Sequence, residues 1–597
     1  MENQQRIIDH LTFLYGAEVA GRMWPRIEAR LQQYAERMAG SQAPGTGRLS
    51  QRDAILITYG DQVRDSRCEP GRAPLASLAA FGERYLEGVV SAIHLLPFYP
   101  YSSDDGFSVI DYRRVHPEMG DWPDVERLGE RFGLMFDAVI NHISQYSDWF
   151  QAYLRGEEPY TDYFITVDPS LDLSNVTRPR ALPLLTEVET AQGTKHVWTT
   201  FSTDQIDLNY ACPEVLYEIV DLLLFYAERG ASLIRLDAIA YMWKEIGTTC
   251  IHLPQTHRAV KLFRDVFVAA AALSGTPEVA MITETNVPHE ENISYFGDPT
   301  PDGTATDEAQ LVYQFSLPPL LMHSLLTGSA RALSRWAAGL EQPPNTTFFN
   351  FCASHDGVGV MPARGLLTPD EIQALADATI AHGGLLGLKN NPDGSQSVYE
   401  LNISYFDALS DPAAGEPLET QVRRFIVSQA IMLALAGVPG IYVHSLLGSR
   451  SWQEGVAQTG RNRTINREKF DQATLEAELA DPGSLRSQVY TAYRTMLQAR
   501  AQEPAFDPYG EQRVLEVGEG VFALLRLAPD GGAPVLCLHN VSGQAQMVQI
   551  ECDDLGMPSG RWRDLLSATT YPGDRDGLAL KLVPYQVCWL GPVPSNL

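Results

Sequence analysis

Cysteine is scarce in this chain, and positive charge is outweighed by negative charge. The 597 residues include seven cysteines, scattered from Cys68 to Cys588 without a Cys-x-x-Cys pair, so no disulfide framework is indicated and reduced thiols are expected. The 45 Lys and Arg face 74 Asp and Glu, and the net charge of −29 argues against nucleic acids and membranes as partners. The sequence also shows neither an apolar run long enough to span a membrane nor a signal-peptide start. These absences favour a cytoplasmic protein.

Apolar strand-like runs and helical patterns alternate from about residue 53 onwards. Each run has the length of a buried strand and is separated from the next by enough residues for a crossover helix. Eight such strands alternating with helices predict an α/β fold, a (β/α)₈ TIM barrel whose active site lies at the C-terminal ends of the strands. The eight runs cover residues 54–60, 92–99, 134–142, 233–239, 279–285, 311–316, 347–355 and 438–444.

The predicted catalytic barrel occupies residues 51–142 and 211–511, and three further regions adjoin it. Residues 1–50 carry apolar side chains at helical spacing, which predicts an N-terminal helical extension that ends in a polar linker at 41–47. Residues 143–210 are too many for one crossover and predict an inserted small domain. Residues 512–597 alternate with Gly-rich turns, which predicts a C-terminal antiparallel β domain. A long excursion at 357–437 is expected to shape the barrel mouth.

Two carboxylates end two of these runs. Asp237 follows Leu233–Leu236, and Glu284 follows Val279–Thr283. If the two strands are neighbours, they lie about 4.8 Å apart, and the carboxylates face each other at about 5 Å. That separation suits the nucleophile and the general acid/base of a retaining glycosidase. The spacing therefore predicts sugar transfer through a covalent intermediate.

Four segments, each at a predicted strand end and in a fixed order, resemble the α-amylase superfamily of retaining α-glucoside enzymes. The resemblance implies that Asp237 is the nucleophile, that Glu284 is the acid/base, and that Asp356 is a third carboxylate that holds sugar hydroxyls. Arg235 shares a strand face with Asp237 and is expected to keep it ionised through charge proximity. The segments are residues 137–142, 234–237, 279–284 and 354–356.

The same resemblance assigns roles to two histidines and indicates whether a metal ion is expected. His142 and His355 are expected to donate hydrogen bonds to hydroxyls of a bound glucose. Asn141 matches a calcium-ligand position of many amylases, but no group of carboxylates is visible nearby in the sequence, so a structural role for Asn141 and no metal are expected.

Further segments resemble the sucrose phosphorylase group within that superfamily; they are residues 56–61, 94–99, 104–111, 178–180, 197–205 and 315–320. The resemblance implies that Asp104 and Arg463 hold the 4-hydroxyl end of the glucose, with Phe107 as an apolar wall and Gln205 as a polar contact. A charged clamp at that end would admit one glucosyl unit and exclude a polysaccharide.

Several positions depart from the shorter sucrose phosphorylases. Asn286 stands where those enzymes carry a histidine that assists phosphate. The acceptor loop 390–402, with Tyr399 and Glu400 as candidate substrate contacts, has Ser397 in place of an expected Asp and Glu400 in place of an expected Gln. These departures, the helical extension and the segments 178–185 and 364–367 resemble the glucosylglycerate phosphorylases more closely.

The resemblance therefore implies a retaining α-glucoside phosphorylase that acts on 2-O-α-glucosyl-D-glycerate, with inorganic phosphate as co-substrate and no cofactor. Sucrose is the alternative substrate, and an α-glucosidase or transglucosidase of the same fold or a non-catalytic sugar-binding relative are alternative functions. A monomer or homodimer is expected. Glycerate and phosphate are both small anions and can share one cationic pocket. Its candidate residues are Arg178, Arg180, Arg364, Lys389 and Arg450, of which only Arg180 has motif support.

Overall fold

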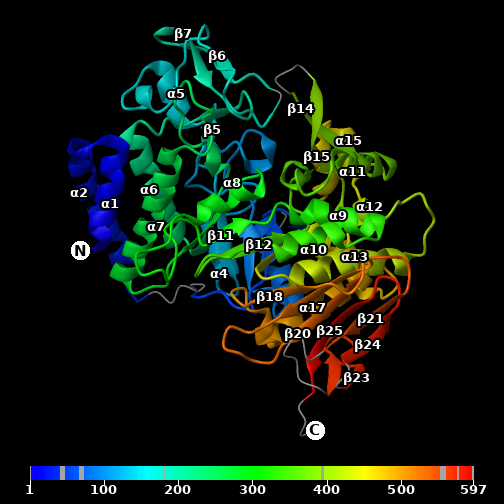
Figure 1. Cartoon of the computed structure of the whole chain (residues 1–597). Coiled ribbons are helices and arrows are strands. Elements are labelled where there is room, and N and C mark those ends of the chain that lie inside the picture. The colour runs from blue at the N-terminus through cyan, green and yellow to red at the C-terminus, as the bar shows by residue number, and fades with distance from the viewer. Residues whose placement is uncertain are drawn as a thin grey trace.

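A closed barrel of eight parallel strands forms the centre of the molecule (Figure 1). The computed structural model describes residues 2–40, 47–65, 73–180, 182–390, 395–551, 560–574 and 577–593. The barrel strands follow one another around the wall in chain order. They are β1 (Ile55–Thr58), β3 (Ala92–Leu95), β4 (Gly133–Ala138), β9 (Ala231–Leu236), β10 (Ala280–Thr283), β11 (Leu311–Tyr313), β12 (Thr347–Phe351) and β16 (Val438–Tyr442).

Each of the eight predicted strand runs overlaps one of these strands, and six contain it entirely, so the predicted fold class is confirmed. The strands are buried almost throughout, because barrel side chains on one face and helices on the other exclude water from both sides. This is why each strand reads as a continuous apolar run rather than as an alternating one. Most of the larger helices between the strands begin with proline at the first turn, as α6 and α7 do.

Helices follow the strands and cover the outside of the barrel. They are α3 (Pro74–Phe81), α4 (Trp122–Gly129), α6 (Pro213–Glu228), α7 (Pro254–Ser274), α8 (His289–Ile293), α9 (Leu317–Thr327), α10 (Arg331–Ala338), α13 (Leu418–Ala434), α14 (Val443–Leu446), α15 (Gln453–Thr459), α16 (Gln472–Ala480) and α17 (Leu485–Gln502). A short parallel pair, β2 (Val63–Arg64) with β17 (Phe470–Asp471), ties the first loop to the last.

Two excursions rise on either side of the barrel mouth (Figure 1). The first, between β4 and α6, contains β5 (His142–Ser144), α5 (Asp148–Arg155), β6 (Leu185–Thr190), β7 (Gly193–Trp198) and β8 (Gln205–Asp207). The second, between β12 and α13, contains β13 (Val358–Gly359), α11 (Pro369–Ala381), the hairpin β14 (Leu385–Asn390) with β15 (Gln396–Asn402), and α12 (Tyr405–Leu409). The second excursion is the segment expected from sequence to shape the mouth.

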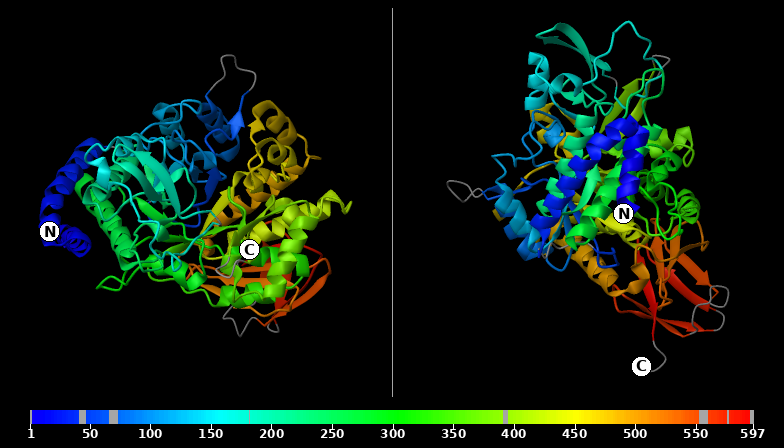
Figure 2. Two further views of the ribbon diagram at one scale, coloured as in Figure 1. Left: turned by 90° about the horizontal axis from the view of Figure 1, so that it is seen from above. Right: turned by 90° about the vertical axis from the view of Figure 1, so that its left-hand side faces the viewer.

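The N-terminal helices α1 (Glu2–Tyr15) and α2 (Ala17–Met38) pack against α6 and α7 on the flank of the barrel (Figure 2). Arg30 is buried and bonds Asp221 and Glu228, and His10 Nε2 lies 3.0 Å from Asp265 Oδ2. Since α6 and α7 precede and follow β9, the extension supports the helices on either side of the strand that leads to Asp237.

The C-terminal region forms an eight-stranded antiparallel sheet at the end of the molecule opposite the inserted strands (Figure 1). Its strands are β18 (Gln512–Leu515), β19 (Val521–Arg526), β20 (Val535–Asn540), β21 (Gln546–Ile550), β22 (Arg561–Asp564), β23 (Thr570–Asp574), β24 (Gly577–Leu582) and β25 (Val587–Pro592). The division of the chain into domains stays a prediction, and residues 41–46 of the predicted linker lie outside the described residues. Within the described part of the chain, no helix has the length and apolar character needed to cross a membrane.

Candidate active site

A pocket at the C-terminal ends of the barrel strands brings together most of the residues singled out from the sequence. It is lined by Asp104, Phe107, His142, Pro179, Arg180, Phe201, Gln205, Arg235, Asp237, Ala238, Glu284, Asn286, His355, Asp356, Tyr399 and Arg463. Of the predicted catalytic and substrate-binding residues, only Glu400 is missing from this lining, and of the candidate cations for an anion pocket only Arg180 is in it.

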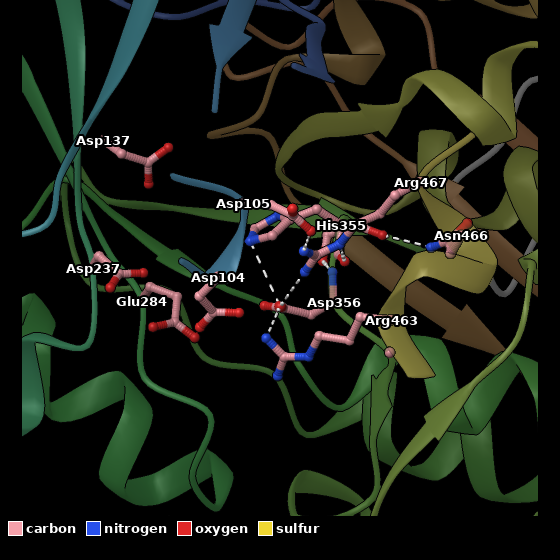
Figure 3. Close-up of polar contacts among 12 residues, drawn as sticks. Asp104, Asp105, Asp137, Asp237, Glu284, His355, Asp356, Arg463, Asn466 and Arg467 are labelled. Carbon is pink, nitrogen blue, oxygen red and sulfur yellow. Dashed lines mark hydrogen bonds and ion pairs between the residues drawn. The ribbon is translucent and has the colours of Figure 1, made fainter. Parts of the chain in front are cut away.

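Asp237 and Glu284 stand at adjacent positions on neighbouring strands. The register of β9 and β10 pairs Leu236 with Thr283, so the next residue on each strand carries a carboxylate (Figure 3). One guanidinium serves both: Arg235 Nη1 donates to Asp237 Oδ1 at 2.7 Å, and its Nη2 lies 3.9 Å from Glu284 Oε2. The two carboxylates therefore lie side by side at this edge of the barrel, and their roles as nucleophile and acid/base stay a prediction.

The residue after Asp237 fixes the orientation of Glu284. Ala238 has φ 50, a left-handed conformation that is unusual for a residue with a side chain. Its backbone N–H donates to Glu284 Oε2 at 3.0 Å. Strained backbone of this kind persists where the surroundings determine it, and it is concentrated at functional sites.

The pKa values of Asp237 and Glu284 depend on each other, because the two carboxylates are close neighbours. Burial raises the pKa of Asp237 above its ordinary value, and the charge of Arg235 opposes this shift while Glu284 and Asp137 add to it. Burial also raises the pKa of Glu284. Arg235 thus acts on Asp237 in the expected direction, but burial shifts the pKa of Asp237 the other way and more strongly. The two carboxylates titrate as a pair, and the closer contact of Arg235 with Asp237 favours a shared proton on Glu284.

A second buried carboxylate explains why Arg235 is not fully available to Asp237. Arg235 also bonds Asp137, which ends β4 and accepts a hydrogen bond from His94 Nε2 at 2.7 Å. Burial alone would raise the pKa of Asp137, but the charges of Arg235 and His94 lower it. Asp137 therefore stays ionised and holds the guanidinium in place beneath the nucleophile.

Asp356 lies across the pocket and is held by cations (Figure 3). Arg463 Nη1 is 2.6 Å from Asp356 Oδ1, Arg467 Nη2 is 3.7 Å away, and His355 Nε2 is 3.6 Å away. Burial opposes ionisation, yet the charge of Arg463 and its neighbours lowers the pKa of Asp356. Burial lowers the pKa of His355 to about 3, so a neutral imidazole and an ionised carboxylate face the substrate at neutral pH.

Asp104 closes the far end of the pocket together with arginines. Arg180 Nη2 donates to Asp104 Oδ2 at 3.1 Å. Burial alone would raise the pKa of Asp104, but the charges of Arg180, Arg463 and Arg467 lower it. Arg467 in turn bonds Asp105. This alternation of acids and arginines forms a wall rather than the two-residue clamp of Asp104 and Arg463 expected from the resemblance.

The polar wall beside Asp104 depends on one backbone carbonyl. Phe107 O accepts from Gln205 Nε2 at 2.9 Å and lies 2.9 Å from His142 Nε2. The Phe107 ring stacks on the His355 ring with centroids 4.8 Å apart, so Phe107 supplies the expected apolar wall. Burial lowers the pKa of His142, which leaves it neutral. His142 Nε2 also lies 3.1 Å from Gln205 Nε2, and that its imidazole donates to a glucose hydroxyl stays a prediction.

A second, larger cavity of about 510 Å³ opens beside Glu284. Glu284, Asn286, Tyr399, Phe201, Ala238 and Pro179 line both cavities. Asn286 Nδ2 donates weakly to the Tyr399 hydroxyl, at 3.5 Å, so this pair stands at the junction. The larger cavity is called here the acceptor chamber, and it shares Glu284 with the first pocket.

Glu400 is turned away from both cavities. It accepts from Arg463 Nη2 at 2.8 Å and from the N–H of Gly357 at 3.2 Å. Glu400 therefore orients Arg463. It lines a further pocket with Asp104, Arg180, Tyr399 and Arg463, and its assignment as a substrate contact stays a prediction.

The five cation candidates fall into different places. Arg178 and Lys389 line the acceptor chamber, and Arg180 lines the glucose-side pocket, where it bonds Asp104. Arg364 lines neither cavity but lies near enough to Lys389 to affect its pKa. Arg450 bonds Asp407 at 2.8 Å and lines neither cavity, so it is not part of the site. That Arg180 binds anions stays a prediction.

One buried network near the site has no signal in the sequence. Lys244 lies after the nucleophile strand, and its Nζ is 2.5 Å from Asp207 Oδ2 and donates to Asn141 Oδ1 at 2.8 Å. Asn141 Nδ2 also donates to Asp207. The Lys244 ammonium thus links Asn141, which precedes His142, to Asp207, which lies two residues after Gln205. Asn141 therefore has the structural role expected of it. Among the described residues, no cluster of three His, Cys, Asp or Glu side chains is arranged to hold a metal ion.

The barrel and its two facing carboxylates define the class of the protein, which is that of α-glucoside-transforming enzymes with an α-amylase-type catalytic domain. The family described as "Alpha amylase, catalytic domain" matches residues 84–351. A solved structure of sucrose 6F-phosphate phosphorylase from Thermoanaerobacter thermosaccharolyticum has the same fold, with a TM-score of 0.68 and 24% identity over 82% of this chain and 94% of that chain.

Two relatives show to which family within this class the chain belongs. The chain is 49% identical to glucosylglycerate phosphorylase of Spirochaeta thermophila, over 99% of both chains, and 46% identical to that of Allomeiothermus silvanus, again over 99% of both. The chain belongs to the glucosylglycerate phosphorylase family, within the α-amylase superfamily. The resemblance read from the sequence is confirmed, and the chain is a glucosyl-transferring enzyme.

Proposed function

We propose that the chain catalyses the phosphorolysis of 2-O-α-glucosyl-D-glycerate with net retention, which gives α-D-glucose 1-phosphate and D-glycerate. The observation that carries the proposal is the arrangement of two cavities about Glu284. The first is walled off at its far end by Asp104, Arg180 and Arg463, which suits a single glucosyl unit. The second extends from Glu284 and suits a small leaving group that is replaced by phosphate.

In the first half-reaction, Asp237 attacks the anomeric carbon, and the bond from that carbon to the glycerate oxygen breaks. Glu284 gives its proton to the departing oxygen, so glycerate leaves as an alcohol. Inversion at carbon yields a β-glucosyl ester of Asp237. Arg235 and Asp137 keep the nucleophile in position through the buried ion pairs described above.

In the second half-reaction, an oxygen of phosphate attacks the same carbon and the ester bond to Asp237 breaks. The second inversion restores the α configuration. Phosphate is already anionic, so its attack needs little help from a base. The proton that hydrogen phosphate carries passes to Glu284 as the new bond forms, which restores the acid for the next turnover. Water would lead to hydrolysis instead, and the competition between phosphate and water separates this proposal from an α-glucosidase.

The choice of glycerate over fructose is supported by the acceptor loop. Glu400 is bonded to Arg463, and Ser397, opposite Lys389 in the hairpin, carries no charge. Two polar positions expected to contact fructose in the shorter sucrose phosphorylases are thus altered, whereas cations line the chamber. Three curated relatives at 43–49% identity carry the name glucosylglycerate phosphorylase.

The test is reverse transfer from α-glucose 1-phosphate to D-glycerate, D-fructose and glycerol, with phosphate release as the readout. D-Glycerate is expected to give the fastest release. Faster release with fructose would make the chain a sucrose phosphorylase, and release at the same rate with no acceptor would make it a hydrolase.

We propose further that phosphate is the only co-substrate and that no cofactor takes part, because Asp237, Glu284 and phosphate supply every bond change and proton. Action in the cytoplasm as a monomer or homodimer belongs to the same proposal. The five cysteines in the described part of the chain are free thiols, which suits a reducing compartment.

A further inference from the structure

The acceptor chamber contains two cations that lack a carboxylate partner among the described residues. Arg178 reaches it from the inserted region between β5 and β6, and Lys389 reaches it from β14. No ion pair or hydrogen bond of either side chain is formed within the described part of the chain. In the same molecule, Arg180, Arg463 and Arg467, which line neighbouring surfaces, are each paired with acids. In a chain of net charge −29, uncompensated cations in a cavity are informative.

The hairpin register explains why Lys389 is directed into the chamber. Lys389 is paired with Ser397, so these two side chains project from one face of the hairpin. Two residues farther along β15, the register shifts at Tyr399, and Lys389 and Tyr399 both line the chamber. The cross-strand neighbour of Lys389 is thus a serine where an aspartate was expected from the sucrose phosphorylases, and the serine leaves the ammonium without a fixed counter-charge on that face.

The charge near Lys389 is further increased by a third cation. Partial burial and the charge of Arg364 lower the pKa of the Lys389 ammonium, which means that an anion placed beside it would be favoured. The acidic residues of the chamber do not fill this role: Glu284 bonds the N–H of Ala238, and Glu291 Oε2 lies 3.3 Å from His252 Nε2.

We propose that Arg178 and Lys389 form an anion subsite in the acceptor chamber that selects acceptors bearing a carboxylate and then receives phosphate when that acceptor has left. The inference rests on the proposed function and adds the residues that determine acceptor specificity. A carboxylate one carbon away from the reacting hydroxyl would reach these cations while the hydroxyl stays at Glu284. A neutral acceptor of the same size would gain nothing from them.

The experiment compares D-glycerate with glycerol, which has the same three-carbon skeleton and no charge, as acceptors for α-glucose 1-phosphate. The variants are Lys389→Met, Arg178→Met and the double variant. We expect Lys389→Met to lower kcat/KM for glycerate about 10-fold or more, and the more exposed Arg178→Met about 3- to 10-fold. For glycerol, kcat/KM is expected to fall much less than for glycerate, because glycerol carries no charge. A thermal unfolding midpoint close to that of the parent shows that the variants are folded.

Lys195→Met is the matched control. Lys195 lies on β7 of the same inserted region, donates to Gln192 at 2.8 Å and lines neither cavity. It removes one positive charge from the neighbourhood without touching the chamber. An equal loss for glycerate in Lys195→Met would show that the effect comes from net charge alone and would overturn the proposal.

A second arm uses α-glucosyl fluoride as donor and compares phosphorolysis with hydrolysis. The ratio of phosphorolysis to hydrolysis should fall in Lys389→Met and Arg178→Met, because water carries no charge. An unchanged ratio together with an unchanged glycerate-to-glycerol preference would overturn the subsite. If the parent enzyme prefers another acceptor over glycerate, the substrate named in the proposed function is wrong. The ratio of phosphorolysis to hydrolysis still decides whether the two cations bind phosphate. A parent that uses neither glycerate nor phosphate would overturn both proposals.

Discussion

Replacement of Glu284 by glutamine tests the assignment of the general acid. Glutamine has the same shape, and its carbonyl oxygen can still accept the hydrogen bond from the N–H of Ala238 that Glu284 Oε2 accepts at 3.0 Å. The substitution therefore removes the transferable proton and little else. Loss of general acid catalysis costs about 10²- to 10⁴-fold, equivalent to about 2.7–5.5 kcal/mol of barrier. We expect a loss of that size with glucosylglycerate as substrate.

An activated donor separates proton transfer from other effects of Glu284→Gln. Fluoride leaves without much protonation, so formation of the glucosyl-enzyme from α-glucosyl fluoride should fall by less than about 10-fold. Stopped-flow release of fluoride measures this step directly. An equal loss on the fluoride and on glucosylglycerate would refute the assignment, because it would mean that the side chain contributes through binding or structure alone.

The pH profile gives an independent check of the same residue. Burial raises the pKa of Glu284, so its proton remains available at pH values above the ordinary range for a glutamic acid. Activity on glucosylglycerate is expected to fall as the pH rises through this raised pKa, because the acid is then lost. The glutamine variant has no such proton, and its profile should lack the fall at high pH; persistence of that fall would assign it to another group.

Three further substitutions test other parts of the site. Asp237→Asn should reduce glucosyl transfer about 10⁴-fold or more with either donor, since no covalent ester can form; near-normal turnover would reject Asp237 as the nucleophile. Lys244→Met should lower the free energy of unfolding by about 3–5 kcal/mol in a denaturant titration, since it leaves Asp207 buried and unpaired, and an unchanged value would contradict the buried ion pair. Arg463→Lys should raise the KM for every glucosyl donor about 10- to 100-fold, because lysine cannot bridge Asp356 and its second carboxylate partner as the guanidinium does; a rise confined to one acceptor would refute this role.

The barrel was predictable because its strands obey a simple physical rule. A parallel strand covered on both faces must be apolar throughout, so β9 and β10 are legible as short runs that end at Asp237 and Glu284. The order of the motifs then gave the superfamily and the catalytic carboxylates. Those conclusions depended on residues close together in the sequence, where the relation between pattern and structure is direct.

The arrangement of charges could not be predicted in the same way. The Arg235 guanidinium forms ion pairs with both Asp137 and Asp237. Glu400 bonds Arg463, which is 63 residues away in the sequence. Nothing in the local pattern of either segment indicates its partner, since a charged residue in a loop is compatible with both a solvated and a buried position. The expectation that failed, for Arg450 as an anion ligand, is of this kind.

The central claim is retaining phosphorolysis at the Asp237 and Glu284 pair, and the stereochemical course tests it most directly. Glucosylglycerate and phosphate are mixed with the enzyme, and the anomeric signals are followed by proton and phosphorus NMR from the first turnover. The account predicts α-glucose 1-phosphate as the first sugar product, formed in equal amount with glycerate and dependent on phosphate. β-Glucose 1-phosphate, which a single displacement would give, or free glucose at a rate independent of phosphate would contradict it.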